Sequence, residues 1–462
     1  MIKTPLKWLV LLGSLALGAG SIACAQDSGA LIDALVRKGI LNDQEAEDIR
    51  ADLTRDYATQ SSAGKLDIAS NVTRLRLSGD ARVRYQFDNE QLNPAGAAGD
   101  RDRNRYRYRV RFGALADLGA KWSAGFRLET ANSATSTNAD LGAGTDNFSK
   151  TDDVVYFGQA YLNFRDNDVL GADAVDLRFG KLPHKFFNPG VNGFWIDSDI
   201  NFEGLAQEVV YNDVGLKNSI LSVRAGQFVL NNNAANSAVT SGPLVNNTVD
   251  PSMLLMGQVE YAAKMSKTSS WKVAPTIVAF AAPSAHDRSA TTALAQASDT
   301  ANYTDLATVL VPFEFITMAG AKPIAFYATY GYNMFGEERA ERLASANTPA
   351  LRALVDSDPS IYNAGVRYGE NKFAGDYQLV GEYRHVGNGS YSSLLLDSDF
   401  NGGLLNGEGF IFSGIYSFTP AITGTITYFN SFNIEENRPV GASRGNGFGQ
   451  AQVIQVDLSA RF

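Results

Sequence analysis

The sequence predicts an all-β fold: a transmembrane antiparallel β-barrel of about sixteen strands with a short N-terminal helical extension. Two observations carry this prediction. From residue 72 onward, apolar and polar residues alternate with period two, as in strands with one apolar and one polar face. The connections between these segments alternate between short and long, which places tight turns at one end of a barrel and long loops at the other. A soluble sandwich or propeller also alternates, but it does not produce this succession of connections.

The composition agrees with this fold and disfavours others. The 462 residues are 45% hydrophobic and 19% charged, which is too apolar for a disordered chain. Beyond residue 25, no run of about 18 apolar residues offers a membrane-spanning helix. The formal net charge of −9 argues against nucleic acid as a general partner.

Residues 1–25 are predicted to be a secretory signal peptide. Two lysines precede a short apolar stretch, and Ala23-Cys24-Ala25 gives the small-x-small cleavage pattern. A lipoprotein signal, in which Cys24 becomes the lipidated N-terminus, is an alternative. An uncleaved anchor helix is another, although about 12 apolar residues are too few to cross a bilayer core of about 30 Å. Cleavage after Ala25 removes the only cysteine, so the mature chain would contain no disulfide.

Residues 26–71 are predicted to form a periplasmic extension, a helical hairpin or coiled-coil arm followed by a linker. Ile32, Leu35 and Val36 recur at helical spacing, and Asp43 is the expected N-cap of a second helix. The extension has two readings, an oligomerisation or cell-wall-facing element and a mobile tail.

Residues 72–462 are predicted to form the barrel. Most of its strands exceed the roughly 9–11 residues that a tilted strand needs to cross a bilayer. Trp122 and Trp271 follow short turns, and Tyr211, Tyr368 and Phe418 precede them, as expected of an aromatic girdle at one membrane interface. The predicted strands are 72–87, 104–117, 121–131, 154–165, 175–182, 202–212, 219–230, 252–263, 271–281, 309–316, 322–332, 361–368, 375–385, 408–418, 421–431 and 452–462.

Arginines occupy the polar face of the first two predicted strands, so the lumen should have an arginine wall. Such a run creates a strong local positive field. Arg82, Arg109 and Arg127 should lie near mid-height, where a constriction is expected. The predicted pore-lining residues are Arg74, Arg76, Arg82, Arg84, Arg105, Arg107, Arg109, Arg111, Arg127 and Arg178.

The last strand ends in Phe462 with apolar residues at alternate positions before it, which resembles the assembly signal of bacterial outer-membrane proteins. With the predicted signal peptide and strand number, the chain resembles a Gram-negative porin. The stretches 34–41 and 177–183 resemble the group of porins related to the phosphate-selective O/P porins, although a long lysine series is absent. The resemblance implies an outer-membrane channel without cofactor, a homotrimer, and recognition of the C-terminal strand by the barrel-assembly machinery.

The third long loop, residues 183–201, is rich in aromatic residues. The porin resemblance implies that this loop folds into the barrel, where Asp197, Asp199 and Glu203 would face the arginines. Opposite charges across a water-filled gap select polar solutes. Two readings follow: a general diffusion pore whose charges balance, and an anion-preferring pore for phosphate-like or carboxylate solutes.

Three further possibilities follow from the residues. Some arginines can pair with lumenal acids such as Asp80, Asp117 and Glu129 and stiffen the wall. An enzyme is disfavoured, because His184, His286 and His385 stand in no catalytic spacing and no metal motif is present. A surface adhesin or receptor is the remaining class, but the long loops consist mainly of Ala, Asn, Ser, Thr, Asp and Gly, which suits a hydrated surface. Lipid and small hydrophilic solutes are the expected partners.

Overall fold

The computed structural model describes residues 32, 35–38, 40–42, 44–51, 68–92, 100–131, 136–143, 154–169, 171–231, 251–281, 306–345, 357–434 and 448–462. The chain divides into two units, Met1–Ala69 and Ser70–Phe462, and each is described by itself. The predicted signal peptide lies outside the described residues.

The N-terminal unit contains helical residues at 35–37 and 44–51. The second helical segment begins with a capping box, because the amide of Glu45 donates to Asn42 Oδ1 (2.8 Å) and the amide of Asn42 donates to Glu45 Oε2 (2.9 Å). The cap is therefore Asn42 and not Asp43, since Asn42 stands three residues before a glutamate that can reach back to it.

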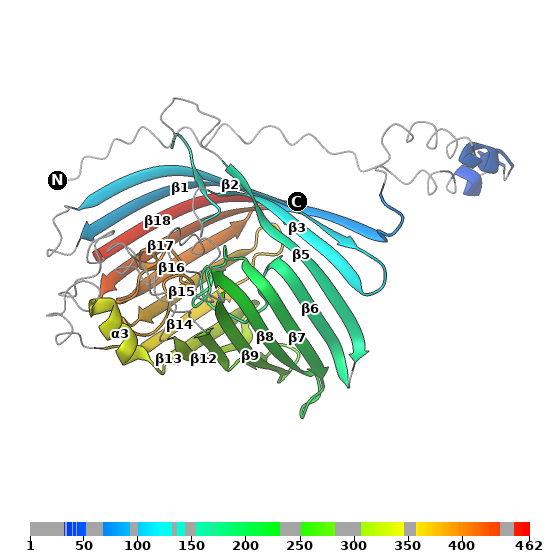
Figure 1. Ribbon diagram of the computed structural model, residues 1–462. Coiled ribbons are helices and arrows are strands. Elements are labelled where there is room, and N and C mark those ends of the chain that lie inside the picture. The colour runs from blue at the N-terminus through cyan, green and yellow to red at the C-terminus, as the bar shows by residue number, and fades with distance from the viewer. Residues whose placement is uncertain are drawn as a thin grey trace, which may run out of the picture. The chain divides into compact units, whose positions relative to one another are not determined.

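The second unit is a closed antiparallel barrel (Figure 1), in which each spanning strand pairs with the spanning strands before and after it and β1 pairs with β18. Sixteen strands span the wall, as predicted, because β4 is a two-residue strand beside β2 and β10 and β11 are halves of one strand. The strands are β1 Arg74–Leu92, β2 Arg101–Asp117, β3 Trp122–Ala131, β4 Ala139–Asp140, β5 Val154–Val169, β6 Ala172–Leu182, β7 Phe202–Asn212, β8 Ser219–Asn231, β9 Ser252–Lys264, β10 Ser270–Val273, β11 Thr276–Ala281, β12 Ala307–Ala319, β13 Lys322–Asn333, β14 Ser360–Gly369, β15 Tyr377–Val386, β16 Gly407–Ser417, β17 Ile422–Asn433 and β18 Phe448–Arg461.

A proline interrupts one spanning strand between β10 and β11. Pro275 lies between β10 and β11 and has no backbone N–H to donate. Its carbonyl still accepts from the amide of Val259 (2.9 Å), and the amide of Ala274 donates to Pro312 O (2.9 Å). The sheet therefore stays continuous across the interruption.

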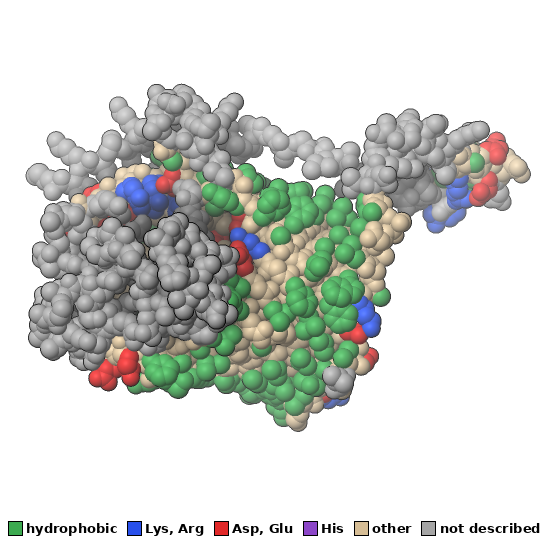
Figure 2. All heavy atoms as spheres, in the orientation of Figure 1, with side chains coloured by type: hydrophobic (Ala, Val, Ile, Leu, Met, Phe, Trp, Pro, Cys, Tyr) green, Lys and Arg blue, Asp and Glu red, His purple; other side chains and the backbone are tan. Residues whose placement is uncertain are grey.

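Hydrophobic side chains gather on the face of the barrel wall seen in Figure 2. Large hydrophobic side chains are exposed on many strands, among them Leu77, Val110, Phe126, Leu255 and Phe412. Their outward exposure around a sheet without free edges indicates a membrane-embedded β-barrel. Aromatic pairs lie near the short turns, with ring centroids 5.1 Å apart for Trp122 and Phe164.

Among the described residues, no helix is both long and apolar enough to cross a membrane. The helix α3, Gly336–Ser345, lies in the long loop between β13 and β14. The 3-10 turn η6, Asn401–Gly403, lies in the loop between β15 and β16.

The inside of the barrel contains a hydrophobic core on one side. Several strands from β6 to β15 place apolar side chains inward, and the loops 183–201 and 387–406 pack on them. Burial of these side chains explains why loop 183–201 is so aromatic. The core consists of Leu182, Phe186, Phe194, Trp195, Ile196, Phe202, Phe228, Leu254, Met256, Val278, Leu306, Leu310, Ile361, Val386, Tyr391, Leu395 and Leu396.

Candidate functional site

The arginine wall is built by the register of β1 and β2. Arg82 lies opposite Arg109 and Arg84 lies opposite Arg107, and the alternation of the strands turns all four inward. Like charges opposite each other destabilise a strand pair unless counter-charges lie nearby. The wall therefore depends on the carboxylates around it.

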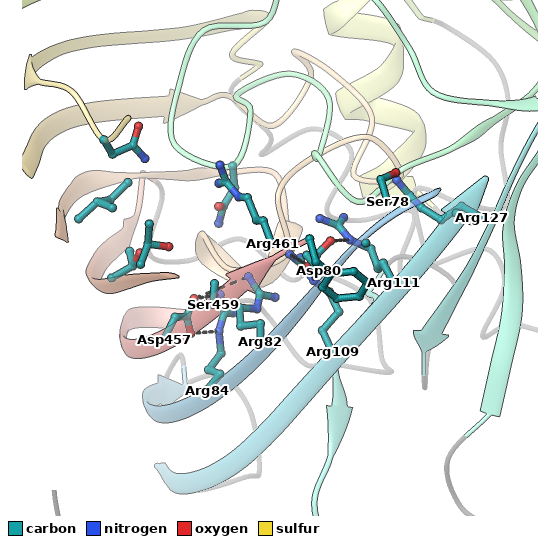
Figure 3. A pocket seen from close by; sticks show the side chains of 18 of the residues that line it. Ser78, Asp80, Arg82, Arg84, Arg109, Arg111, Arg127, Asp457, Ser459 and Arg461 are labelled. Carbon is teal, nitrogen blue, oxygen red and sulfur yellow. Dashed lines mark hydrogen bonds and ion pairs between the residues drawn. The ribbon is translucent and has the colours of Figure 1, made fainter. Parts of the chain in front are cut away.

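Those carboxylates come first from the strands themselves (Figure 3). Asp80 accepts from Arg109 Nη2 (2.9 Å) and Arg111 Nε (2.6 Å). Asp457 of β18 accepts hydrogen bonds from both Nε and Nη2 of Arg84 (2.7 and 2.8 Å), so the two side chains form a bidentate ion pair. Arg82 is 3.6 Å from the same Asp457, so one carboxylate serves two guanidinium groups.

The third strand and the short β4 complete the pairing of the wall. Arg127 pairs with Glu129 of its own strand (2.7 Å). Arg107 pairs with Asp140 of β4 (2.5 Å), and Arg105 pairs with Asp88 (3.0 Å). This part of the wall is charge-balanced.

Loop 183–201 crosses the lumen. Its backbone amide at Val191 donates to Glu382 Oε2 on β15 (2.7 Å), and the carbonyl of Val191 accepts from Arg384. At its other end, Asp199 lies 3.5 Å from Arg109 and 3.6 Å from Arg111. The loop thus connects β15 to the arginine wall from within the barrel.

The three predicted acids of this loop have three different environments. Asp199 faces the arginines, whereas Asp197 is buried against loop 387–406, whose Leu395 carbonyl accepts from the Asp197 amide (2.7 Å). Glu203 does not face the arginines, so that prediction is wrong. Its register partner is Lys181, and the two form a 3.4 Å pair with Glu203 62% exposed. On β7, Phe202 and not Glu203 is on the inward side, because the side-chain period of a strand is two.

A second inward loop, residues 387–406, was not predicted. Asp397 lies 3.3 Å from Arg384, and Asp399 lies 3.4 Å from Arg84. Although burial opposes ionisation, Arg84 and its neighbours hold the pKa of Asp399 below the usual range of an aspartate. The loop brings a further carboxylate to the arginine wall from a distant part of the sequence.

The carboxyl groups between the two loops have raised pKa values. Burial, followed by the charges of Asp397 and Asp199, raises the pKa of Asp197 to about 9. Burial and Asp399 raise the pKa of Asp397 to about 7, although Arg384 acts in the opposite direction. At neutral pH, the pair therefore holds at least one proton.

A cavity of about 910 Å³ remains between the arginine wall, the inner faces of β13 to β18 and residues 190–192 of the inward loop. Among the residues that the structure describes, its charged lining is uneven, with eight arginines and two aspartates, Asp80 and Asp457. Its arginines are Arg76, Arg82, Arg84, Arg109, Arg111, Arg127, Arg367 and Arg461. Its neutral polar lining includes Ser78, Gln378, Ser413, Thr423, Thr425, Thr427 and Ser459.

Two of these arginines differ from the rest. Within the described residues, Arg76 and Arg461 have no carboxylate at ion-pairing distance, and both are exposed. Arg461 of β18 and Arg367 of β14 were not predicted as pore-lining. The sequence did contain a signal for Arg461. It lies two and four residues after Ser459 and Asp457 on β18, so all three side chains belong to the same, inward face of the strand.

The remaining predicted arginines do not line the cavity. Arg74 lies at the start of β1, 3.7 Å from Asp117. Arg105 and Arg107 lie beyond the cavity, toward the end of β2 that joins a long loop. Arg178 pairs with Asp176 (3.0 Å) and donates to the carbonyl of Pro183 (3.2 Å), so it fixes the start of loop 183–201.

The histidines do not form a catalytic site in the described residues. Desolvation lowers the pKa of His184, which is half-buried, to about 4. His385 lies between Asp358 (2.6 Å) and Glu408 (3.1 Å) and stacks on Tyr362. His286 lies outside the described residues, and in the described part no group of three or more His, Cys, Asp or Glu side chains is arranged to hold a metal ion.

Comparison with known proteins gives a family match. The family model described as "Putative porin" matches residues 86–311, just under half of the chain. This match supports a porin and suggests a channel rather than an enzyme. A comparison with curated proteins found no match.

Solved structures with a similar course of the chain include three porins. The chain is 11% identical to Salmonella typhi OmpF in complex with daunomycin, covering 86% of this chain and 100% of that one, with a TM-score of 0.44. The chain is also 11% identical to a high-pH structure of Pseudomonas putida OprB, covering 84% of this chain and 94% of that one, with a TM-score of 0.45. It is 10% identical to a mutant of Rh. blastica porin, covering 84% of this chain and 100% of that one, with a TM-score of 0.39.

Proposed function

We propose that this protein is a porin of the bacterial outer membrane, a passive water-filled channel for small hydrophilic solutes and ions that prefers anions. An apolar outer surface on a closed barrel suits lipid, and a polar cavity beside the inward loops suits water and dissolved solutes. The family match over residues 86–311 supports the same class.

The observation that carries the anion preference is the excess of arginine in the cavity. Most of the arginines have a carboxylate partner, but Arg76 and Arg461 face the cavity without one among the described residues. Arginine stays charged in any plausible environment, and a cavity with one predominant sign of charge raises the local concentration of the opposite ion. Chloride and small carboxylates should therefore enter more readily than potassium.

A solute-specific channel for phosphate or carboxylate is the second candidate. It is favoured by the neutral hydroxyl-bearing residues beside the arginines, which offer donors and acceptors to a polar anion. Trimeric assembly, recognition of the C-terminal strand by the assembly machinery and the relation to the phosphate-selective group stay predictions.

The test is single-channel recording of the refolded mature protein in a planar bilayer under a KCl gradient. Stable conductance steps with a reversal potential that favours chloride support the proposal. Steps that favour potassium refute the anion preference and leave a general pore. A folded, heat-modifiable barrel that gives no steps refutes the channel itself.

A further inference from the structure

The two inward loops contain five-residue sequences that differ at one position only. Residues 197–201 read Asp-Ser-Asp-Ile-Asn and residues 397–401 read Asp-Ser-Asp-Phe-Asn, each preceded by Ile or Leu. Nothing else in the loops repeats in this way, and the two copies stand 200 positions apart in the chain.

Both copies fold in the same way. In the first, Asp197 Oδ1 accepts the amide of Asp199 (2.9 Å), and the carbonyl of Asp197 accepts the amide of Ile200 (3.1 Å). In the second, Asp397 Oδ1 accepts the amide of Asp399 (3.0 Å), and the carbonyl of Asp397 accepts the amide at position 400 (3.3 Å). An aspartate that binds the amide two residues later fixes a tight turn.

The two turns also bind each other. The amide of Asp197 donates to the carbonyl of Leu395 (2.7 Å), and the amide of Ser398 lies 3.5 Å from Asp197 Oδ2. Asn192 Nδ2 donates to Asp399 Oδ2 (3.3 Å), so the first loop also holds the second aspartate of the other copy. We call this pair of turns, residues 197–201 and 397–401, the twin clasp.

The second aspartate of each turn reaches the arginine wall. Asp199 lies 3.5 Å from Arg109 and 3.6 Å from Arg111, and Asp399 lies 3.4 Å from Arg84. These three arginines line the cavity (Figure 3), whereas neither aspartate is among its lining residues. Each turn thus supplies one negative charge to one level of the wall.

We propose that the twin clasp sets the charge selectivity of the channel, and that Asp399 of loop 387–406 is a selectivity determinant equivalent to Asp199 of loop 183–201. The inference rests on the proposed channel function. The first aspartate of each turn fixes its shape, the backbone joins the loops, and the second aspartate reduces the positive field of the arginines beside it. The four carboxylates do not form a metal site, because three of them pair with arginines and the described residues contain no metal-binding arrangement.

The test compares Asp199→Asn, Asp399→Asn and the double variant in planar bilayers at 0.1 M KCl. Each substitution removes one negative charge near the ion path, so the chloride-to-potassium permeability ratio should rise about threefold, and about ninefold in the double variant. Asp166→Asn is the matched control, because Asp166 pairs with Lys121 (2.6 Å) and does not line the cavity. Its ratio should equal that of the wild type.

A charge-compensated variant separates selectivity from structure. In Arg84→Gln/Asp399→Asn one positive and one negative charge are removed together, so the ratio should return close to the wild-type value. If Asp399→Asn does not fold, the charge-retaining Asp399→Glu should fold and keep the wild-type ratio. The inference is overturned if Asp399→Asn keeps the wild-type ratio while Asp199→Asn raises it, or if Asp399→Glu changes the ratio. A wild-type barrel that gives no conductance instead refutes the proposed function.

Discussion

Arg76 and Arg461 offer the most direct test of the anion preference. Both line the cavity, and neither has a carboxylate partner in the described part of the chain, so their replacement leaves no buried acid unpaired. We expect Arg76→Gln and Arg461→Gln to reduce anion preference without unfolding the barrel. By contrast, Arg109→Ala should also favour cations but lower stability, because Asp80 loses a 2.9 Å partner.

The size of the effect follows from the geometry. A sphere with the cavity volume of 910 Å³ has a radius of about 6 Å, which we take as the distance from each guanidinium to the ion path. At that distance in water, the Coulomb energy between one guanidinium and a monovalent ion is about 0.7 kcal/mol. Screening at 0.1 M salt reduces this to about 0.4 kcal/mol. The charge favours the anion and disfavours the cation equally, so each substitution should lower the chloride-to-potassium permeability ratio about fourfold. The double variant should lower it by more than about tenfold.

The assay is the reversal potential across a planar bilayer with unequal KCl on the two sides, repeated at 0.1 M and 1 M salt. The effect should shrink at 1 M, where the screening length falls to about 3 Å. Lys121→Gln is the control, because Lys121 lies at a short turn, pairs with Asp166 and does not line the cavity. If both arginine variants keep the wild-type ratio at 0.1 M, the ion path does not pass this cavity and the electrostatic reasoning is wrong.

Three further outcomes are expected. The pKa values of about 9 for Asp197 and about 7 for Asp397 lie above 3.8, the usual value of an aspartate, so the closed loops bind protons more tightly than open ones. Closure should be firmest below about pH 4, where both carboxyl groups are protonated in either state, and should weaken as the pH rises from about 4 to about 9. Asp197→Asn should reduce this dependence of channel noise on pH. Trp195→Ala empties a fully buried site, so the free energy of unfolding should fall by about 3–5 kcal/mol and the unfolding temperature should drop. Conductance should rise, because the loop loses its largest buried side chain. Unchanged conductance would show that the loop does not limit the pore. A Cβ at Gly125 would lie 2.5 Å from the ring of Tyr161, which lines the cavity, so Gly125→Val should push the ring inward and lower conductance, and a normal conductance would contradict this packing.

The strands and the arginine wall were predictable because they depend on local periodicity. Arg82 and Arg109 face inward as the alternation requires, and their strands pair in the order of the sequence. Glu203 was misplaced because its orientation depends on where loop 183–201 ends and β7 begins, a shift of one residue that reverses the face.

The second inward loop was not predictable from local pattern. Asp399 meets Arg84 from more than three hundred positions away, and no periodicity encodes such a contact. A signal was present in the inward-facing positions Phe228, Leu254 and Leu310, which are apolar where a water-filled barrel should be polar. Apolar inward positions require a cover, and the aromatic loop and its partner provide it.

The hydrophobic core inside the barrel has a consequence for how the channel responds to its surroundings. Its cohesion comes from excluding water, as in a water-soluble enzyme, whereas the outer wall is solvated by lipid acyl chains. Denaturants and cold weaken such a core without removing the barrel from the bilayer. Loosening of the loops should therefore precede melting of the strands, and the width of the passage should be governed by aqueous conditions rather than by bilayer composition.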